Sequence, residues 1–325
     1  MHRTIGRIGT GIVMAVIVTV AGAGFASESG AAGGVKVATV APPPPGVQGP
    51  IAYGPQPYEV LDLQLPDAAT QPGPWPVIIY VHSGGWIGGE RTAVPEVATD
   101  QIERGYAVVS IDYQLAATGP EGQAEPSFPG AIWDVKRAIR FVKANAIPWN
   151  IDPSRVILMG ASAGGYLAAF TGAAAEYFEP PEARPTSNPR KNSSVRGIVD
   201  FVGPTNLVTF QPTDHPWAAP LTASFLGCAV PSPADPLPCP DGILGTASVE
   251  AYVDASDPPI FLAYGADDEL VVAATQGAPL ARVWLDTHRG DPSSTLYDLV
   301  EGAGHTLPSD DTLGPLTAFF DRVAA

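Results

Sequence analysis

Charged residues are scarce in this sequence, and basic residues are scarcer than acidic ones. Lys, Arg, Asp and Glu make up only 15% of the 325 residues, and 17 Lys and Arg stand against 33 Asp and Glu, for a formal net charge of −16. A surface of that sign repels phosphate backbones, which argues against a nucleic-acid partner. Hydrophobic residues make up 45% of the chain, so a sizeable buried core is expected.

Cysteine is almost absent as well, since Cys228 and Cys239 are the only two. Two thiols do not complete a metal site, and no cluster of His and Cys surrounds them. We therefore expect no bound metal, and no feature of the sequence implies an organic cofactor. In an exported chain, such a close pair is typical of one disulfide that closes a small loop.

Long apolar runs are missing except at the N-terminus. Residues 1–26 combine a short basic start with the apolar, small-residue stretch "GIVMAVIVTVAGAGFA", which is too short to predict a membrane span. We interpret residues 1–26 as a signal peptide cleaved after Ala23 or Ala26, the alternative being an uncleaved anchor. The mature chain is then expected to be secreted or extracytoplasmic, without a stable membrane span. The sequence does not indicate an oligomeric state.

Two compositional regions follow this segment. Residues 27–50 are rich in Gly and then in Pro, which is typical of a linker. From residue 51 to residue 325, strand-like and helix-like segments alternate, which predicts one α/β catalytic domain with a mostly parallel sheet and helices on both faces. The expected strands are 58–65, 76–82, 106–113, 155–160, 195–203, 258–265 and 294–302.

One helix and one interruption stand out in this domain. Residues 131–146 place Ile132, Val135, Ile139 and Val142 on one helical face, with Lys and Arg on the other. Residues 204–257 are rich in proline, contain both cysteines and show only weak periodicity. Inserted segments of that length are usually lids or binding loops.

The stretch "RVILMGASAGG" predicts a strand that ends in a sharp turn around Ser162. A G-x-S-x-G match alone is weak in a glycine-rich chain, and an ordinary Gly-rich turn is the alternative. Here a strand precedes the match and a helix follows it, as a nucleophile elbow requires, because Gly160 and Gly164 leave room for the tight turn. We therefore predict that Ser162 is a nucleophile.

A serine nucleophile needs a base, and histidine is the usual one. The chain has five histidines, of which His2 lies in the signal segment and His82 begins a Gly-rich loop. His215 lies in the insertion and His288 near the end of a helical run. His305, in the small-residue loop "VEGAGHTLP" directly after the last predicted strand, is the predicted base, with a structural histidine as the alternative.

The acid that orients this base is expected after another strand. In hydrolases with such an elbow, the acid lies between the serine and the histidine in chain order. The segment "FLAYGADDELV" offers Asp267, Asp268 and Glu269. We predict Asp268, with Asp267 as the alternative, because the loop register is not fixed by sequence. Its carboxylate would accept the Nδ1 hydrogen of His305.

The stretch "HSGGW" follows the predicted strand at 76–82. Two adjacent glycines allow backbone N–H groups to approach a developing oxyanion. We predict that the amides of Gly84 and Gly85 form an oxyanion hole with the amide of Ala163, the residue after the nucleophile. A plain Gly-Gly turn is the alternative.

These motifs together resemble a known family. "YVHSGGWIGGERT", "IDYQLA", "DPSRVILMGASAGG", "VDFVGPTNL", "PPIFLAYGADDELV" and "VEGAGHTL" resemble, in order and spacing, the α/β-hydrolases of the hormone-sensitive-lipase-like and acetyl-esterase-like carboxylesterase group, near feruloyl-esterase-like proteins. The likeness covers roughly residues 75–325. It departs at Ser83, where the group usually has glycine, at Ala161, where the lipase-like branch has Asp, and in the insertion.

The resemblance implies a serine carboxylesterase that hydrolyses short-acyl or small aryl or carbohydrate esters through an acyl-enzyme. Ser162, Asp268 and His305 occupy the family's triad positions, and the expected partner is a small-molecule ester. The alternatives are an exopeptidase or arylformamidase on the same triad, and a non-catalytic binding module with a hydrolase fold.

Aromatic residues near the predicted site have two interpretations. Trp86, Phe210, Trp217 and Phe225 could line an acyl or aryl pocket, or they could form the core beneath a lid. The motif at Asn192 matches a glycosylation acceptor.

Overall fold

The computed structural model describes residues 47–118, 124–180, 188, 190–210, 218–228, 239–240, 242–306 and 310–325. The predicted signal peptide, most of the predicted linker and part of the predicted insertion lie outside the described residues.

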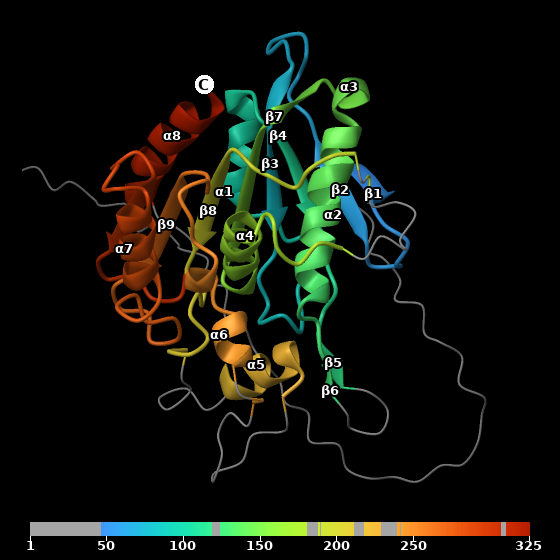
Figure 1. Cartoon of the computed structure of the whole chain (residues 1–325). Helices are drawn as coiled ribbons and strands as arrows, with labels where there is room; N and C mark the ends of the chain where they lie inside the picture. Colours follow the sequence, from blue (N-terminus) through green and yellow to red (C-terminus); the bar gives the residue numbers. More distant parts are fainter. Residues whose placement is uncertain are drawn as a thin grey trace, which may run out of the picture. The chain divides into compact units, whose positions relative to one another are not determined.

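An eight-stranded sheet in the order β1-β2-β4-β3-β7-β8-β9-β10 forms the centre of the fold (Figure 1). Neighbouring strands from β4 to β10 are parallel, whereas β1 and β2 are antiparallel additions at one edge. The predicted α/β-hydrolase class, with a mostly parallel sheet, is thereby confirmed. The strands are β1 (Gln48–Ala52), β2 (Val60–Gln64), β3 (Trp75–Val81), β4 (Ala107–Ile111), β7 (Ile151–Ala161), β8 (Gly197–Phe201), β9 (Ile260–Gly265) and β10 (Thr295–Val300).

Helices cover both faces of this sheet. Side chains of β3 alternate between two apolar clusters, with Val77, Ile79 and Val81 on one face and Ile78 and Tyr80 on the other. The first face packs against α2, α4 and α7, and the second packs against α1 and α8. The helices are α1 (Glu96–Thr99), α2 (Gly130–Ala144), α3 (Ala146–Trp149), α4 (Ala163–Ala173), α5 (Ala218–Leu226), α6 (Ile243–Thr246), α7 (Gly277–Thr287) and α8 (Asp310–Ala324), with short 3-10 turns η1 (Asp100–Arg104) and η2 (Val249–Ala251).

Strand β1 departs from the sequence interpretation. The predicted linker runs to residue 50, yet β1 begins at Gln48, which already pairs with Leu63 of β2. Along β1, exposed and half-buried residues alternate at the sheet edge. Such a strand buries little apolar surface, so no hydrophobic run marks it in the sequence.

Helix α2 fits its prediction on one face only. Ile132, Val135, Ile139 and Val142 are fully buried as expected. On the other side, Lys136 and Arg137 are also fully buried. Arg137 forms ion pairs with Glu59 and Asp134, and the ammonium group of Lys136 donates a 2.7 Å hydrogen bond to the carbonyl of Ala174. Asp134 lies in the same helix, whereas Glu59 and Ala174 come from distant segments; together they satisfy charges that the helical pattern places on the second face.

The described part of the insertion forms α5, α6 and η2. In Figure 1, α5 and α6 lie beyond the carboxyl ends of the parallel strands. The predicted disulfide between Cys228 and Cys239 is confirmed, with the two Cα atoms 4.6 Å apart. A short two-stranded ladder, β5 (Ala117–Thr118) with β6 (Ala124–Glu125), lies near α5. Among the described helices, none is both long and apolar enough to cross a membrane.

Candidate active site

Ser162 lies on a tight turn between β7 and α4. Its backbone has φ 53° and ψ −122°, a conformation that is strained for a residue with a side chain. The amide of Ser162 donates a 2.7 Å hydrogen bond to the carbonyl of Phe201 in β8, which holds the turn against the sheet. The predicted sharp turn is therefore present. Its strained conformation is stabilised by the hydrogen bond to the neighbouring strand rather than by the local sequence.

The two glycines of the motif are required by close packing. A Cβ atom on Gly160 would lie 2.1 Å from the carbonyl oxygen of Gly164. A Cβ atom on Gly164 would lie 2.1 Å from the carbonyl oxygen of Val81 at the end of β3. Because both obstacles are backbone atoms, no rotamer change relieves them. The G-x-S-x-G spacing thus reflects the contact of the turn with its own helix and with β3.

His305 lies in the loop after β10, and its Nε2 atom is 3.0 Å from the Oγ of Ser162. Its Nδ1 atom is 2.8 Å from Oδ2 of Asp268, which lies in the loop after β9. The structure thus brings Ser162, His305 and Asp268 into one hydrogen-bonded line from three separate loops at the carboxyl edge of the sheet.

The carboxyl group of Asp268 is fixed on both oxygens. Its side chain is inaccessible to solvent, and its Oδ1 accepts hydrogen bonds of 2.8 and 2.9 Å from the amides of Leu270 and Val271. Asp267, the alternative acid, is exposed and uses its amide to bond the carbonyl of Ala303. Of the two neighbours, Asp268 is therefore the one whose carboxylate contacts the histidine.

In the loop "HSGGW", two adjacent residues lack side chains, so a substrate oxygen can approach their backbone amides, as an oxyanion hole requires. Gly84 and Gly85 have φ values of 124° and 60°, and Ile87 and Gly88 donate their amides to the carbonyl of Gly84. Within the described part of the chain, the amides of Gly84, Gly85 and Ala163 donate to no acceptor. All three predicted donors therefore remain available to a ligand.

The start of this loop is anchored by His82. Its ring is buried and stacks on Tyr113 with ring centroids 4.3 Å apart, and the hydroxyl of Tyr113 donates a 3.0 Å hydrogen bond to the carbonyl of His82. Burial lowers the pKa of His82, which favours a neutral ring. His82 therefore positions the glycine loop rather than facing the serine.

The other histidines do not reach Ser162 in the described structure. His288 ends α7, where its Nδ1 lies 2.7 Å from the carbonyl of Trp284 and its Nε2 lies 3.1 Å from the carbonyl of Asp257. Both ring nitrogens are thus occupied by backbone. His215 lies outside the described residues.

Helix α5 packs against the glycine loop. Phe225 stacks on Trp86 with centroids 4.5 Å apart, and both side chains are fully buried, as is most of Phe210. Half-buried Leu221 comes so close to Gly85 that a Cβ atom there would lie 2.9 Å from its Cδ1. Trp86 and Phe225 thus form core between the insertion and the body of the protein, and Leu221 is the side chain presented to the loop. Trp217 lies outside the described residues.

Asp200 is a buried acid that the motif analysis missed. Its Oδ1 accepts a 2.9 Å hydrogen bond from the amide of Gly203 and would be 2.1 Å from a Cβ on Gly165, in the first turn of α4. Burial raises the pKa of Asp200 to about 7. An acid within the apolar strand "GIVDF" is the sequence signal that could have indicated it.

The polar partners of Asp200 can accommodate a protonated carboxyl group. The hydroxyl oxygen of Tyr264 lies 2.8 Å from Oδ2 of Asp200 and 2.6 Å from the carbonyl oxygen of Gly203. Tyrosine has one hydrogen for these two oxygens. When it donates to the carbonyl, a protonated Asp200 completes the network by donating to the tyrosine oxygen.

Comparison with known proteins gives the same architecture. A truncated carbohydrate esterase from gut microbiota has a TM-score of 0.69 at 24% identity, covering 87% of this chain and 99% of that chain. A butyrate-bound thermophilic esterase of Thermogutta terrifontis has a TM-score of 0.65 at 21% identity, covering 86% and 95%. At sequence identities of 21% and 24%, the structural similarity shows that this chain shares the fold of these esterases.

Sequence comparison gives the family. Esterase LipQ of Mycobacterium tuberculosis is 30% identical over 234 residues, 70% of this chain and 50% of LipQ. Carboxylesterase NlhH of the same species is 39% identical over 95 residues, 29% of this chain and 28% of NlhH. The chain thus spans half or less of the length of these curated relatives. A family model described as BD-FAE matches residues 61–283, well over half of the chain, and the protein therefore belongs to the BD-FAE family of α/β-hydrolases.

Proposed function

We propose that this protein is a serine carboxylesterase that works through an acyl-enzyme. The observation that carries the proposal is the hydrogen-bonded line from Ser162 through His305 to Asp268, with distances of 3.0 and 2.8 Å. The relatives LipQ and NlhH are named as an esterase and a carboxylesterase, which favours an ester over a peptide or a formamide as the substrate.

In the first half of the reaction, Ser162 attacks the ester carbonyl while its proton passes to Nε2 of His305. Asp268 holds the ring by accepting the Nδ1 hydrogen and stabilises the imidazolium that forms. The negative oxygen of the tetrahedral intermediate is bound by the free amides of Gly84, Gly85 and Ala163. The C–O bond to the alcohol then breaks, and the alcohol leaves with the proton from His305.

The second half repeats these roles with water. His305 takes a proton from a water molecule, whose oxygen attacks the acyl carbon. The same amides bind the new oxyanion, and collapse of this intermediate releases the carboxylic acid while Ser162 recovers its proton. The cycle consumes the ester and one water molecule and returns Ser162, His305 and Asp268 to their starting protonation states.

A short acyl group is the best fit to the surroundings of Gly85. Leu221 lies against this glycine, and α5 is held in place by the Phe225–Trp86 stack and by a 3.0 Å hydrogen bond from the amide of Phe128 to the carbonyl of Phe225. A fixed apolar side chain next to the oxyanion loop limits the length of an acyl chain there. The butyrate bound to the Thermogutta esterase and the carbohydrate esterase title support short-acyl and carbohydrate esters as substrates.

We also propose that the protein is exported. The basic and apolar N-terminal segment supports export, and the Cys228–Cys239 disulfide is typical of an oxidising compartment. Expression of the full chain in a secreting host, followed by N-terminal sequencing, tests this. A mature end after Ala23 or Ala26 is expected, and full-length protein in the cytosol would contradict export.

Labelling with a fluorophosphonate, which reacts with activated serines, tests whether the protein is a serine hydrolase at all. We expect one adduct per folded chain, located by mass spectrometry on Ser162. Heat-denatured protein and the Ser162→Ala variant should not react. Absence of labelling in the folded wild type would favour a binding module that has the hydrolase fold without its chemistry.

A further inference from the structure

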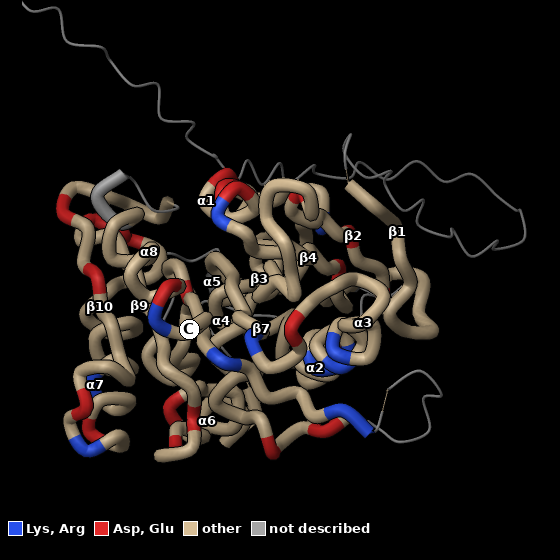
Figure 2. Tube along the Cα trace, turned by 90° about the horizontal axis from the view of Figure 1, so that it is seen from above, with Lys and Arg blue, Asp and Glu red and all other residues tan. Residues whose placement is uncertain are grey.

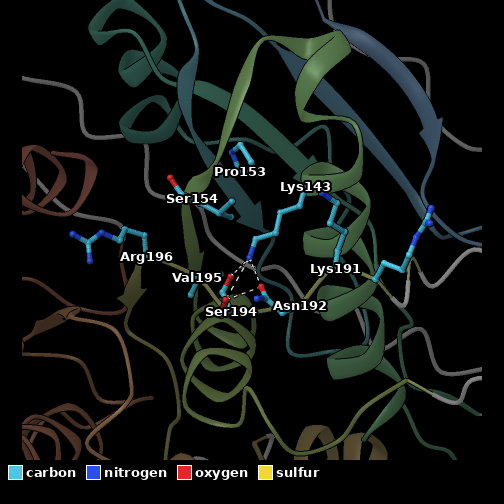
Figure 3. Close-up of a pocket in the computed structure, with 10 residues that line it drawn as sticks. Lys143, Pro153, Ser154, Lys191, Asn192, Ser194, Val195 and Arg196 are labelled. Atoms are coloured by element: carbon cyan, nitrogen blue, oxygen red, sulfur yellow. Dashed lines mark hydrogen bonds between the residues drawn. The ribbon is translucent and has the colours of Figure 1, made fainter.

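A second candidate site lies at the amino-terminal edge of the sheet, opposite the catalytic loops. A pocket of about 450 Å³ opens between the end of α2, the start of β7 and the segment that leads into β8 (Figure 3). Lys143, Arg190, Lys191 and Arg196 all line it, and the described residues of its lining include no acid. Four basic side chains at one pocket are unusual in a chain that has only 17 Lys and Arg and a net charge of −16.

Acids among the described residues do not neutralise these cations. In the part of the chain that the structure describes, none of the four forms an ion pair with a carboxylate. Asp152, in the neighbouring hollow that shares Arg196, is paired instead with Arg155 at 2.8 Å. Seen from this side, basic residues gather around α2 and β7 (Figure 2). The pocket is therefore a local positive region on an acidic protein.

Lys143 forms the floor of this region. It is 8% exposed, and its ammonium group donates hydrogen bonds of 2.7 Å to Oδ1 of Asn192 and 2.5 Å to the carbonyl of Ser194 (Figure 3). Burial, and then the charges of Lys191 and Arg140, lower the pKa of Lys143 to about 8. The acceptors orient the ammonium group without cancelling its charge, so an anion in the pocket would stabilise it.

The position of Lys143 in the last turn of α2 gives a simpler explanation for its presence. A lysine there interacts favourably with the helix dipole. That explanation does not extend to Arg190, Lys191 and Arg196, which lie outside helices in exposed positions. They border the pocket from different sides, and in Figure 3 the guanidinium group of Arg196 points away from the ammonium group of Lys143.

We propose that this pocket binds a phosphate or sulfate group, either as the free ion or as a monoester of a small molecule. Tetrahedral oxyanions accept several hydrogen bonds at once, and Arg and Lys are their usual protein partners. The pocket is much larger than the roughly 30 Å³ that one water molecule occupies in the liquid, so it has room for an organic group attached to the anion. This site does not depend on the proposed esterase activity.

Isothermal titration calorimetry at constant ionic strength tests the proposal, with inorganic phosphate, sulfate and glucose 6-phosphate as probes. Wild type should bind at least one of them, and the double variant Lys191→Gln, Arg196→Gln should bind it roughly tenfold or more weakly. Both positions are exposed, so the variant should fold. Arg282→Gln is the matched control, because Arg282 is an exposed cation on α7 paired with Asp286, and its affinity should equal that of wild type.

The probes also distinguish a site for the free ion from a site for a phosphate monoester. Tighter binding of glucose 6-phosphate than of inorganic phosphate identifies a monoester site, and equal or weaker binding identifies a free-ion site. No binding to wild type, or equal binding to wild type and the double variant, would overturn the proposal. Tighter binding of glucuronate than of all three probes would overturn the assignment to phosphate or sulfate.

Discussion

The Nε2 atom of His305 lies 3.0 Å from the hydroxyl oxygen of Ser162, although 143 positions separate the two residues in the chain. Their strands, β10 and β7, are not neighbours, because β8 and β9 lie between them. Parallel strands end at the same edge of the sheet, so the loops after β7 and β10 can meet there. The contact therefore depends on the assembled sheet and not on a local motif.

Asp268→Asn should lower kcat/KM for p-nitrophenyl acetate by roughly ten-thousandfold, because the amide no longer holds the imidazole in the required tautomer. Asp267→Asn is the matched control in the same loop. Since Asp267 is exposed and the structure links its neighbour to His305, the control should retain nearly all activity. Comparable losses in the two variants would show that the acid is wrongly assigned.

Gly164→Ala should disrupt the elbow. The new methyl group would lie 2.1 Å from the carbonyl oxygen of Val81, so α4 or β3 must shift, and a displaced nucleophile loses roughly a hundredfold in rate. The activity and the melting temperature should both fall. Gly245→Ala in α6, where nothing lies within 4 Å of the added atom, should leave both unchanged, and a Gly164→Ala enzyme of normal activity would contradict the packing described here.

Leu221→Ala should widen the space beside Gly85. We expect the ratio of kcat/KM for p-nitrophenyl hexanoate to that for the acetate to rise roughly tenfold, because Leu221 no longer limits the acyl chain. Ile147→Ala, which removes a 94% exposed apolar side chain on α3, is the control. An unchanged ratio in an active Leu221→Ala enzyme would place the acyl group elsewhere.

The buried Asp200 should make stability depend on pH. Its pKa of about 7 in the folded protein is above the value near 3.9 of an unfolded chain, so the folded state holds the proton more tightly. Its stabilising contribution is complete below about pH 4 and is lost as the pH rises towards 7, by at most roughly 1.4 kcal/mol per pH unit.

Asp200→Asn gives the reference for this effect. The amide oxygen can accept from Gly203, and the amide nitrogen can donate to the hydroxyl oxygen of Tyr264, as a protonated acid would when Tyr264 donates to the carbonyl of Gly203. The free energy of unfolding in urea, measured from pH 4.5 to 8, should therefore decrease for wild type relative to the variant as the pH rises. Parallel curves for the two proteins would show that Asp200 does not titrate in this range.

Sequence alone could predict the features that depend on residues close together in the chain. The sheet class follows from apolar runs of strand length, and the glycines around Ser162 indicate a turn whose crowding the structure explains. His305 could be selected because only five histidines compete. The choice between Asp267 and Asp268 needed coordinates, since one residue of loop register decides which carboxylate faces inward.

Features that depend on distant partners could not be predicted. Arg137 is fully buried because Glu59, far away in the chain, pairs with it. Trp86 is core because Phe225 of the insertion stacks on it, whereas the sequence left a substrate pocket and a lid core open for both residues. Charge and aromaticity are visible in a sequence, but the partner that buries them is not.

The most direct measurement is steady-state hydrolysis of p-nitrophenyl acetate by wild type and by Ser162→Ala, with circular dichroism to verify that both are folded. The Ser162–His305–Asp268 arrangement predicts saturable turnover by wild type and a loss of kcat by several orders of magnitude in the variant, without loss of fold. Equal turnover by the two folded proteins, or none by wild type on esters from acetate to palmitate, would contradict the serine esterase.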